Sequence, residues 1–71
     1  MQKENRFEMF FLPSKKGMIR VFIYGFDAPG SWGQVFAQYH DYTINMKGYN
    51  KKKTIIQTLN KLNERLINEN L

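Results

Sequence analysis

The segment Lys47-Gly-Tyr-Asn-Lys-Lys-Lys53 joins a strand pattern to the long helical pattern that runs from Thr54 to Leu71. Gly48 ends the strand, and Asn50 is a suitable N-cap because its side chain accepts a hydrogen bond from a free N–H in the first helical turn. Apolar residues then recur every three or four positions, the spacing of a helix with one buried face. They are Ile55, Leu59, Leu62 and Leu66, with Ile56 and Ile67 widening the stripe. The sequence therefore predicts an amphipathic C-terminal helix.

Two strand patterns lie near the N-terminus. Residues 6–12 (RFEMFFL) and 18–26 (MIRVFIYGF) are rich in the aromatic and β-branched residues that favour strands. Between them, Pro13-Ser-Lys-Lys-Gly17 begins with proline and ends with glycine, as a turn does. We expect the two strands to form a β-hairpin.

The second of these strands has two different faces, because side chains alternate along a strand. One face is aliphatic, with Ile19, Val21 and Ile23, and suits packing under a helix. The other carries Arg20, Phe22, Tyr24 and Phe26. A single helix covers one face of a small sheet, so the aromatic face needs residues 27–41, a second subunit or a ligand to cover it.

Residues 31–41 permit two interpretations. In one, Ser31 and Gln34 form a capping box that begins a short helix near residues 31–40. In the other, which we favour, a strand begins at Gln34 and runs with little break into Tyr42–Met46, where apolar and polar residues alternate.

The predicted fold is a single small domain, residues 1–71, of the α+β class. A small antiparallel three-stranded sheet, consisting of the β-hairpin and a third strand, packs on the C-terminal helix. Residues 27–31 form a turn after the hairpin, with Pro29-Gly30 at the central positions of type II.

Positive charge is concentrated in the C-terminal part of the chain. The formal net charge is +5. Residues 47–71 hold six lysines and arginines against two acidic residues, and residues 1–46 hold five against four. In a three-stranded meander, the third strand would end beside the start of the second. Lys47 and Lys51–Lys53 would then join Lys15 and Lys16 in one basic patch, the footprint of a nucleic-acid-binding protein.

The string from Lys47 to Thr54 is similar to the strand–helix junctions of two families. One is the arm-binding domain of tyrosine recombinases, a three-stranded sheet with a C-terminal helix. The other is the double-stranded RNA-binding domain, whose last helix begins with clustered lysines. Within these 71 residues we expect neither the helix that precedes the first strand of the RNA-binding domain nor the catalytic domain to which the recombinase domain is normally attached. The resemblance implies nucleic-acid binding.

Several function classes have no support in the sequence. Without cysteine, and with His40 as the one histidine, the chain offers no thiolate or histidine-rich metal site, and we expect no cofactor and a cytoplasmic location. No apolar run reaches membrane-spanning length, and residues 1–6 lack a signal-peptide core. The abundance of Asn, Lys and Ile is typical of AT-rich genomes and of phage or plasmid products.

Catalysis has no support either. The residues of a nominal triad are scattered without the required spacing; they are Ser14, Ser31, Asp27, Asp41 and His40. Gly25, Gly30 and Gly33 do not form a phosphate-binding loop. We therefore expect no enzymatic activity and no small-molecule substrate.

Two functions remain. The first is a small basic protein that binds nucleic acid, DNA rather than RNA, through phosphate contacts. The expected contacts are Lys15, Lys16, Arg20, Lys47, Lys51, Lys52 and Lys53, with Phe22, Tyr24, Phe26 and Trp32 stacking on bases or forming an interface. The alternative is a protein-binding module, for example an inhibitor of a host or defence protein or a homodimer, because exposed aromatic surfaces mark interfaces.

Overall fold

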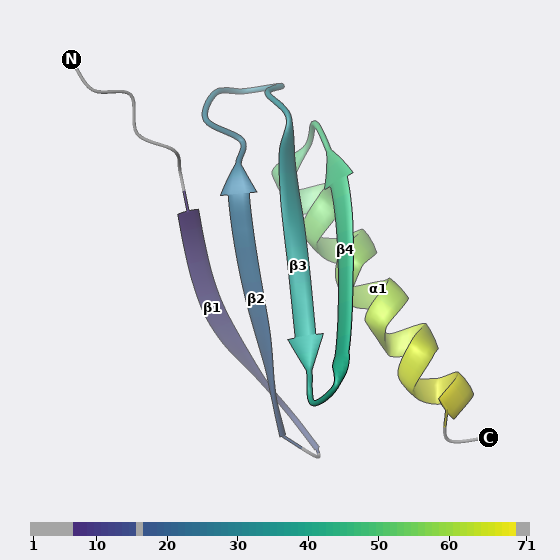
Figure 1. The fold of residues 1–71 in the computed structure, drawn as a ribbon. Coiled ribbons are helices and arrows are strands. Elements are labelled where there is room, and N and C mark those ends of the chain that lie inside the picture. Colours follow the sequence, from purple (N-terminus) through teal and green to yellow (C-terminus); the bar gives the residue numbers. More distant parts are fainter. Residues whose placement is uncertain (1–6, 16, 70–71) are drawn as a thin grey trace.

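The computed structural model describes residues 7–15 and 17–69, which form four strands followed by one helix (Figure 1). The elements are β1 (Phe7–Ser14), β2 (Gly17–Gly25), β3 (Gly33–Tyr39), β4 (Tyr42–Gly48) and α1 (Lys51–Glu69). The strands pair in the order β1-β2-β3-β4, each antiparallel to the next. The α+β class and the C-terminal helix predicted from the sequence are confirmed.

The predicted number of strands is wrong, because residues 33–48 form two strands instead of one. β3 and β4 make a hairpin in which Tyr39 lies opposite Tyr42. His40, in the two-residue turn, has a φ of 54°, the left-handed backbone that tight hairpin turns use. No glycine or asparagine marks this turn in the sequence. The alternative of a short helix near residues 31–40 is also wrong, and the fourth strand departs from the three-stranded sheet of the recombinase domain.

The connection from β2 to β3 contains the predicted type II turn. The N–H of Ser31 donates to the carbonyl oxygen of Ala28 at 2.9 Å. Gly30 has a φ of 81°, as the third position of a type II turn requires. The Ser31 hydroxyl also donates to the Ala28 carbonyl at 2.8 Å and accepts the Ala28 N–H at 3.0 Å. These bonds stabilise the turn, and the Phe26 N–H, which donates to the Trp32 carbonyl oxygen at 3.1 Å, closes the connection.

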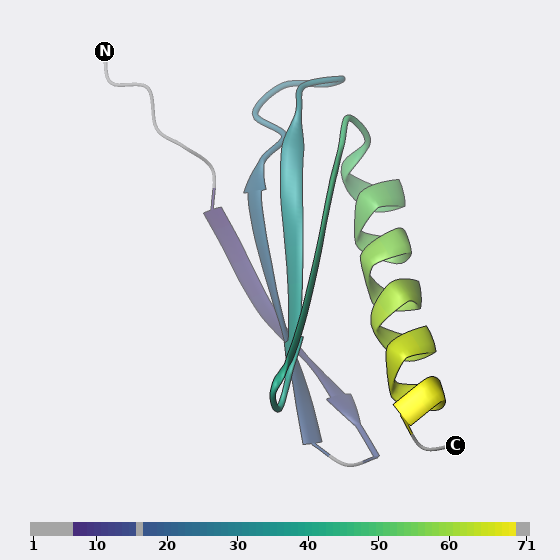
Figure 2. The same cartoon turned by 45° about the vertical axis from the view of Figure 1, so that its right-hand side comes forward.

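Helix α1 lies on one face of the sheet, against β3 and β4 (Figures 1 and 2). We call this the helix-covered face and the opposite one the open face. The core lies on the helix-covered face, and its most buried apolar members are Val21, Ile23, Val35, Ala37, Tyr39, Ile44 and Leu62. The predicted aliphatic face of the second strand, with Ile19 at its margin, therefore packs beneath the helix.

The buried side of α1 follows a line of residues spaced four apart. Thr54, Thr58 and Leu62 are at most 2% exposed. Each threonine hydroxyl donates at 2.7 Å to the carbonyl four residues earlier, so no buried donor is left unpaired. Ile56 and Ile67 do not widen the buried stripe as predicted, because the threonines rather than these isoleucines face the sheet, and both isoleucines are at least half exposed.

We expect Leu62→Ala to lower the free energy of unfolding by about 2–5 kcal/mol, because it removes a core side chain that is 1% exposed. The matched variant Ile67→Ala removes a side chain that is 53% exposed and should change stability by less than about 1 kcal/mol. Urea denaturation followed by circular dichroism measures both. Equal losses for the two variants would contradict the observed orientation of α1.

Candidate functional site

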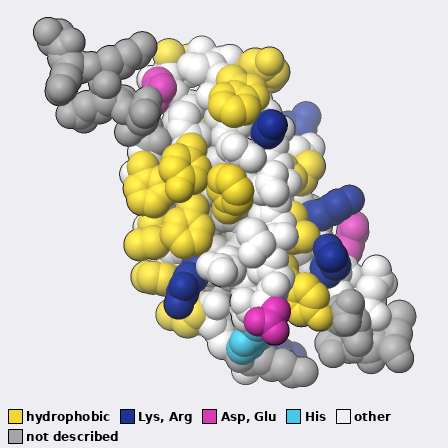
Figure 3. Space-filling view, in the orientation of Figure 1, with side chains coloured by type: hydrophobic (Ala, Val, Ile, Leu, Met, Phe, Trp, Pro, Cys, Tyr) yellow, Lys and Arg dark blue, Asp and Glu magenta, His cyan; other side chains and the backbone are white. Residues whose placement is uncertain are grey.

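Among the described residues, no helix or loop lies over the strands of the open face, which is rich in apolar side chains (Figures 1 and 2). In Figure 3, hydrophobic side chains gather over the part of the sheet formed by β1 and β2. Six large apolar residues on or beside this face are between 44% and 55% exposed; they are Phe7, Met9, Phe11, Met18, Tyr24 and Trp32. The open face therefore presents a group of exposed apolar side chains of the kind found at binding surfaces.

Four aromatic rings on the open face form a connected cluster, which we call the aromatic cluster; its members are Phe7, Phe22, Tyr24 and Phe36. Phe7 lies opposite Tyr24 across the β1–β2 pair, with ring centroids 4.9 Å apart. Tyr24 meets Phe36 edge to face at 5.7 Å. These distances lie within the range that aromatic pairs prefer, so the rings support one another while one side of the cluster remains exposed to solvent.

A shallow hollow of about 230 Å³ opens within the cluster. Its walls are Phe22, Tyr24, Phe36, Gln38 and Thr43. Gln38 and Thr43 lie opposite each other in the β3–β4 pair, so an amide and a hydroxyl line the polar side of the hollow. The hollow thus combines flat apolar walls with hydrogen-bonding groups on one side.

Two cations flank this surface. Arg20 shares the open face because it lies opposite Phe11 and Gln38, and Lys47 shares it because it lies opposite Gln34. The Lys47 ammonium lies over the Trp32 ring, 5.8 Å from its centroid, within the range of a cation–π contact.

Carboxylates are absent from the strands on this face. Among the strand residues that the structure describes, none with a side chain on the open face is Asp or Glu. Asp27 and Asp41 lie in connections at opposite ends of the sheet. The open face is therefore cationic and apolar along its strands, which suits an anionic partner with flat apolar groups.

The predicted lysine patch does not form as one surface. Ser14 pairs with Gly17 at one end of the sheet, whereas Gly33 pairs with Gly48 at the other, so Lys15 is remote from Lys47. The additional strand is the cause, because β4 runs in the same direction as β2 instead of antiparallel to it (Figure 1). The predicted Lys16 contact lies outside the described residues.

The lysines of the helix start lie near Lys47 in the fold but on the other side of the sheet. Lys51 is paired with Glu8 of β1 through a 2.7 Å hydrogen bond between ammonium and carboxylate. The Lys53 N–H donates to the side-chain oxygen of the N-cap Asn50 at 2.9 Å, as predicted for a cap. Lys52 and the Lys53 side chain are exposed. The ion pair of Lys51 and the cap at Asn50 therefore reduce the number of free cations and backbone N–H groups with which the helix start could bind a phosphate.

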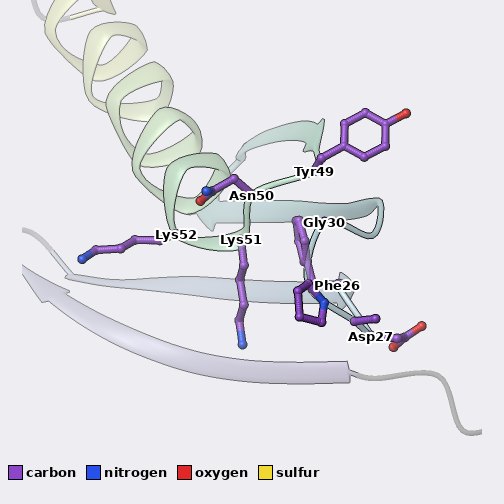
Figure 4. A pocket seen from close by; sticks show the side chains of 9 residues that line it. Phe26, Asp27, Gly30, Tyr49, Asn50, Lys51 and Lys52 are labelled. Atoms are coloured by element: carbon purple, nitrogen blue, oxygen red, sulfur yellow. The ribbon is translucent and has the colours of Figure 1, made fainter.

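A wider, open hollow of about 580 Å³ lies between the β2–β3 connection and the helix start (Figure 4). Residues 26–30 and 49–52 line it. In Figure 4 the Tyr49 ring points away from the hollow, and the Lys51 side chain extends toward β1. Phe26, Asp27 and Pro29 belong to one side of the hollow, and Asn50, Lys51 and Lys52 belong to the other. Among the described residues, no buried polar side chain is left without a partner.

Phe26 was predicted to share a face with Phe22 and Tyr24, but it does not lie on the open face. Gly25 and Phe26 both adopt positive φ, 84° and 56°, which interrupts the alternation of β2. The Phe26 ring packs instead beside Val21, Ile23 and Val35 on the helix-covered face and lies against the Cα of Gly33.

The residues of the nominal triad are divided between the two ends of the sheet, and in the described part of the chain no hydrogen bond joins His40 to a serine or an aspartate. The Ser14 and Ser31 hydroxyls bond to backbone carbonyls of their own turns. The His40 ring lies edge-on to Tyr39 at 4.3 Å in the β3–β4 turn. Ser14, His40 and Asp41 lie at one end of the sheet, and Asp27 and Ser31 lie at the other.

Comparison with known proteins identifies no relative: no family model, curated protein or solved structure matches this chain. Within the described part of the chain, no helix is long and apolar enough to cross a membrane. In the same residues, no group of three or more His, Cys, Asp or Glu side chains is placed to hold a metal ion.

Sequence reasoning identified Arg20, Phe22, Tyr24, Trp32 and Lys47 but missed the rest of the open face. Phe7, Met9 and Phe11 alternate with Phe10 and Leu12, so both faces of β1 are apolar and no pattern separates them. Phe36, Gln38 and Thr43 join the site only through the register of β3 with its neighbours. Pairing Phe22 with Phe36 would have identified them. That pairing can be inferred only if residues 33–48 are correctly divided into two strands.

The loop that holds Trp32 beside Lys47 depends on a close approach at Gly33. A Cβ on Gly33 would collide with the Phe26 ring, so we expect Gly33→Ala to destabilise the protein by about 1–3 kcal/mol. It should also shift Trp32 fluorescence in the folded state. Gly30→Asn is the control, because Asn tolerates positive φ and nothing lies within 4 Å of a Cβ there. A Gly33→Ala protein as stable as the control would contradict the packing of Phe26.

Proposed function

We propose that this protein binds nucleic acid through its open face, with Arg20 and Lys47 contacting phosphates. The observation that carries the proposal is a sheet surface with exposed aromatic side chains, two flanking cations and no carboxylate on its described strand residues. Phosphates supply the negative charge that attracts this surface, and bases supply flat groups that fit its rings.

The charge of the whole chain supports the same proposal. The formal net charge is +5, which raises the rate at which a polyanion meets the protein. Lys52 and Lys53 are exposed at the end of the sheet that also carries Lys47. They add to the positive potential there without lying on the open face.

A protein partner is the second candidate, and one observation favours it. Phe7, Met9 and Phe11 are each about half exposed on β1, an edge strand of the sheet. Exposed apolar side chains on an edge are a suitable surface for another protein. A protein partner held by these side chains would be retained at high salt, whereas nucleic acid would be released, so the two candidates are separable by one titration.

We expect fluorescently labelled DNA or RNA to bind with an affinity that falls as salt rises, because each phosphate contact releases counterions. Lys47→Gln should weaken binding and reduce the slope of log Kd against log salt by about 0.7–1, the contribution of one phosphate contact. Fluorescence anisotropy between about 50 and 200 mM salt measures both quantities.

The matched control is Lys61→Gln, which removes the same charge from an exposed position on α1. It should leave the slope within about 0.3 of the wild-type value, because the lysine contacts no phosphate in this proposal. Absence of binding to both DNA and RNA at the lowest salt concentration would overturn the proposed function, and equal effects of the two variants would remove Lys47 from the site.

A further inference from the structure

We infer that the nucleic acid is single-stranded and that its bases stack on the aromatic cluster. This inference rests on the proposed function and narrows it to one class of ligand. The phosphates of the same strand would pass Arg20 at one end of the cluster and Lys47 at the other.

The aromatic cluster favours unpaired bases over a duplex. Tyr24 is 44% exposed and Phe7 is 51% exposed, and both belong to the same group of touching rings. In a duplex the flat faces of the bases are stacked on one another, and the outer surface is charged phosphate. A duplex would therefore set phosphates against apolar rings, whereas a single strand can turn its bases toward them.

The hollow in the cluster supplies polar contacts for the edge of a base. Gln38 offers an amide donor and acceptor, and Thr43 offers a hydroxyl, next to the walls formed by Phe22, Tyr24 and Phe36. Neither side chain makes a hydrogen bond to another described residue, whereas the neighbouring Gln34 and Asn45 side chains bond to each other at 3.2 Å. The hollow can thus hold a stacked base and bond to its edge.

Arg20 and Lys47 lie where they could contact the phosphates of a nucleic-acid strand that crosses the aromatic cluster. Arg20 is on β2 near the β1–β2 turn, and Lys47 is two strands away near the opposite end of the sheet. The spacing of strands and residues in a sheet places their Cα atoms roughly 16 Å apart on a diagonal. That diagonal passes over Phe36, which pairs with Phe22 on β2 and with Asn45 on β4.

A second copy of this chain is a poorer occupant of the open face. In a symmetric dimer each copy would present the same surface, with Arg20 and Lys47 and with no carboxylate on the described strand residues. Each copy also carries a formal net charge of +5. A polyanion neutralises these charges and a second copy doubles them, so charge complementarity favours nucleic acid.

The experiment compares a single-stranded oligonucleotide of about 12 nucleotides, a length within the site sizes of sheet-based binders, with a hairpin duplex of the same composition. Binding is followed by anisotropy of the labelled strand and by quenching of Trp32, the one tryptophan in the chain. We expect the single strand to bind more tightly. Tyr24→Ala should weaken single-strand binding about 5- to 150-fold, the effect of losing one stacked base.

Two control variants separate stacking from other effects. Tyr24→Phe keeps the ring and should bind within about twofold of the wild type, because stacking needs the ring face and not the hydroxyl. Ile56→Ala removes a side chain that is 50% exposed on α1 and should bind as the wild type does. Circular dichroism confirms that each variant is folded before binding is measured.

The other possible results would contradict either the single-strand inference alone or the proposed function as well. Tighter binding of the duplex, or unchanged single-strand binding by folded Tyr24→Ala, would overturn this inference and leave the proposed function standing. A mass of two chains by light scattering that Tyr24→Ala reduces to one would show that a second copy occupies the face, which also overturns the inference. No binding to either oligonucleotide would overturn the proposed function as well.

Discussion

A single helix packs against a four-stranded sheet and can cover only one of its two faces. The 19-residue α1 lies on the side that holds Val21, Val35 and Ala37, all fully buried. That packing fixes which side chains of every strand form the core, because neighbours in register share a face. The side chains that point to the open face, including the aromatic cluster, then stay exposed because no second helix among the described residues covers them. The core and the candidate site are two consequences of one alternation along the strands.

The alternation of residue types along β2 and β4 made it possible to predict from the sequence which side chains belong to each face of the sheet. Ile19, Val21 and Ile23 indicated the helix-covered face, and Tyr24 and Arg20 indicated the other. The number of strands was not predictable in the same way, because the turn at His40 carries no glycine or asparagine to interrupt the strand pattern. That single turn reverses the chain once more than the sequence suggested. It moves Lys47 to the end of the sheet opposite Lys15 and so divides the predicted basic patch.

Other parts of the site depend on backbone geometry that residue types do not reveal. Phe26 leaves the open face because two successive residues take positive φ, and one of them is Phe26 itself rather than a glycine. Gln38 and Thr43 face the hollow only because β3 and β4 pair in the observed register. On α1, the sequence pattern predicted that Ile56 and Ile67 would be buried, but Thr54 and Thr58 are buried instead. The threonines can be buried because their hydroxyls donate hydrogen bonds to the helix backbone.

Methionine methyl groups report directly on whether nucleic acid occupies the open face. Met9 and Met18 lie on the open face and are about half exposed, whereas Met46 lies opposite Val35 on the helix-covered face. In NMR spectra of methyl-labelled protein, adding a single-stranded oligonucleotide should shift the Met9 and Met18 signals and leave Met46 nearly unchanged. Shifts confined to Met46, or saturation with nucleic acid without any shift of Met9 and Met18, would contradict binding at the open face.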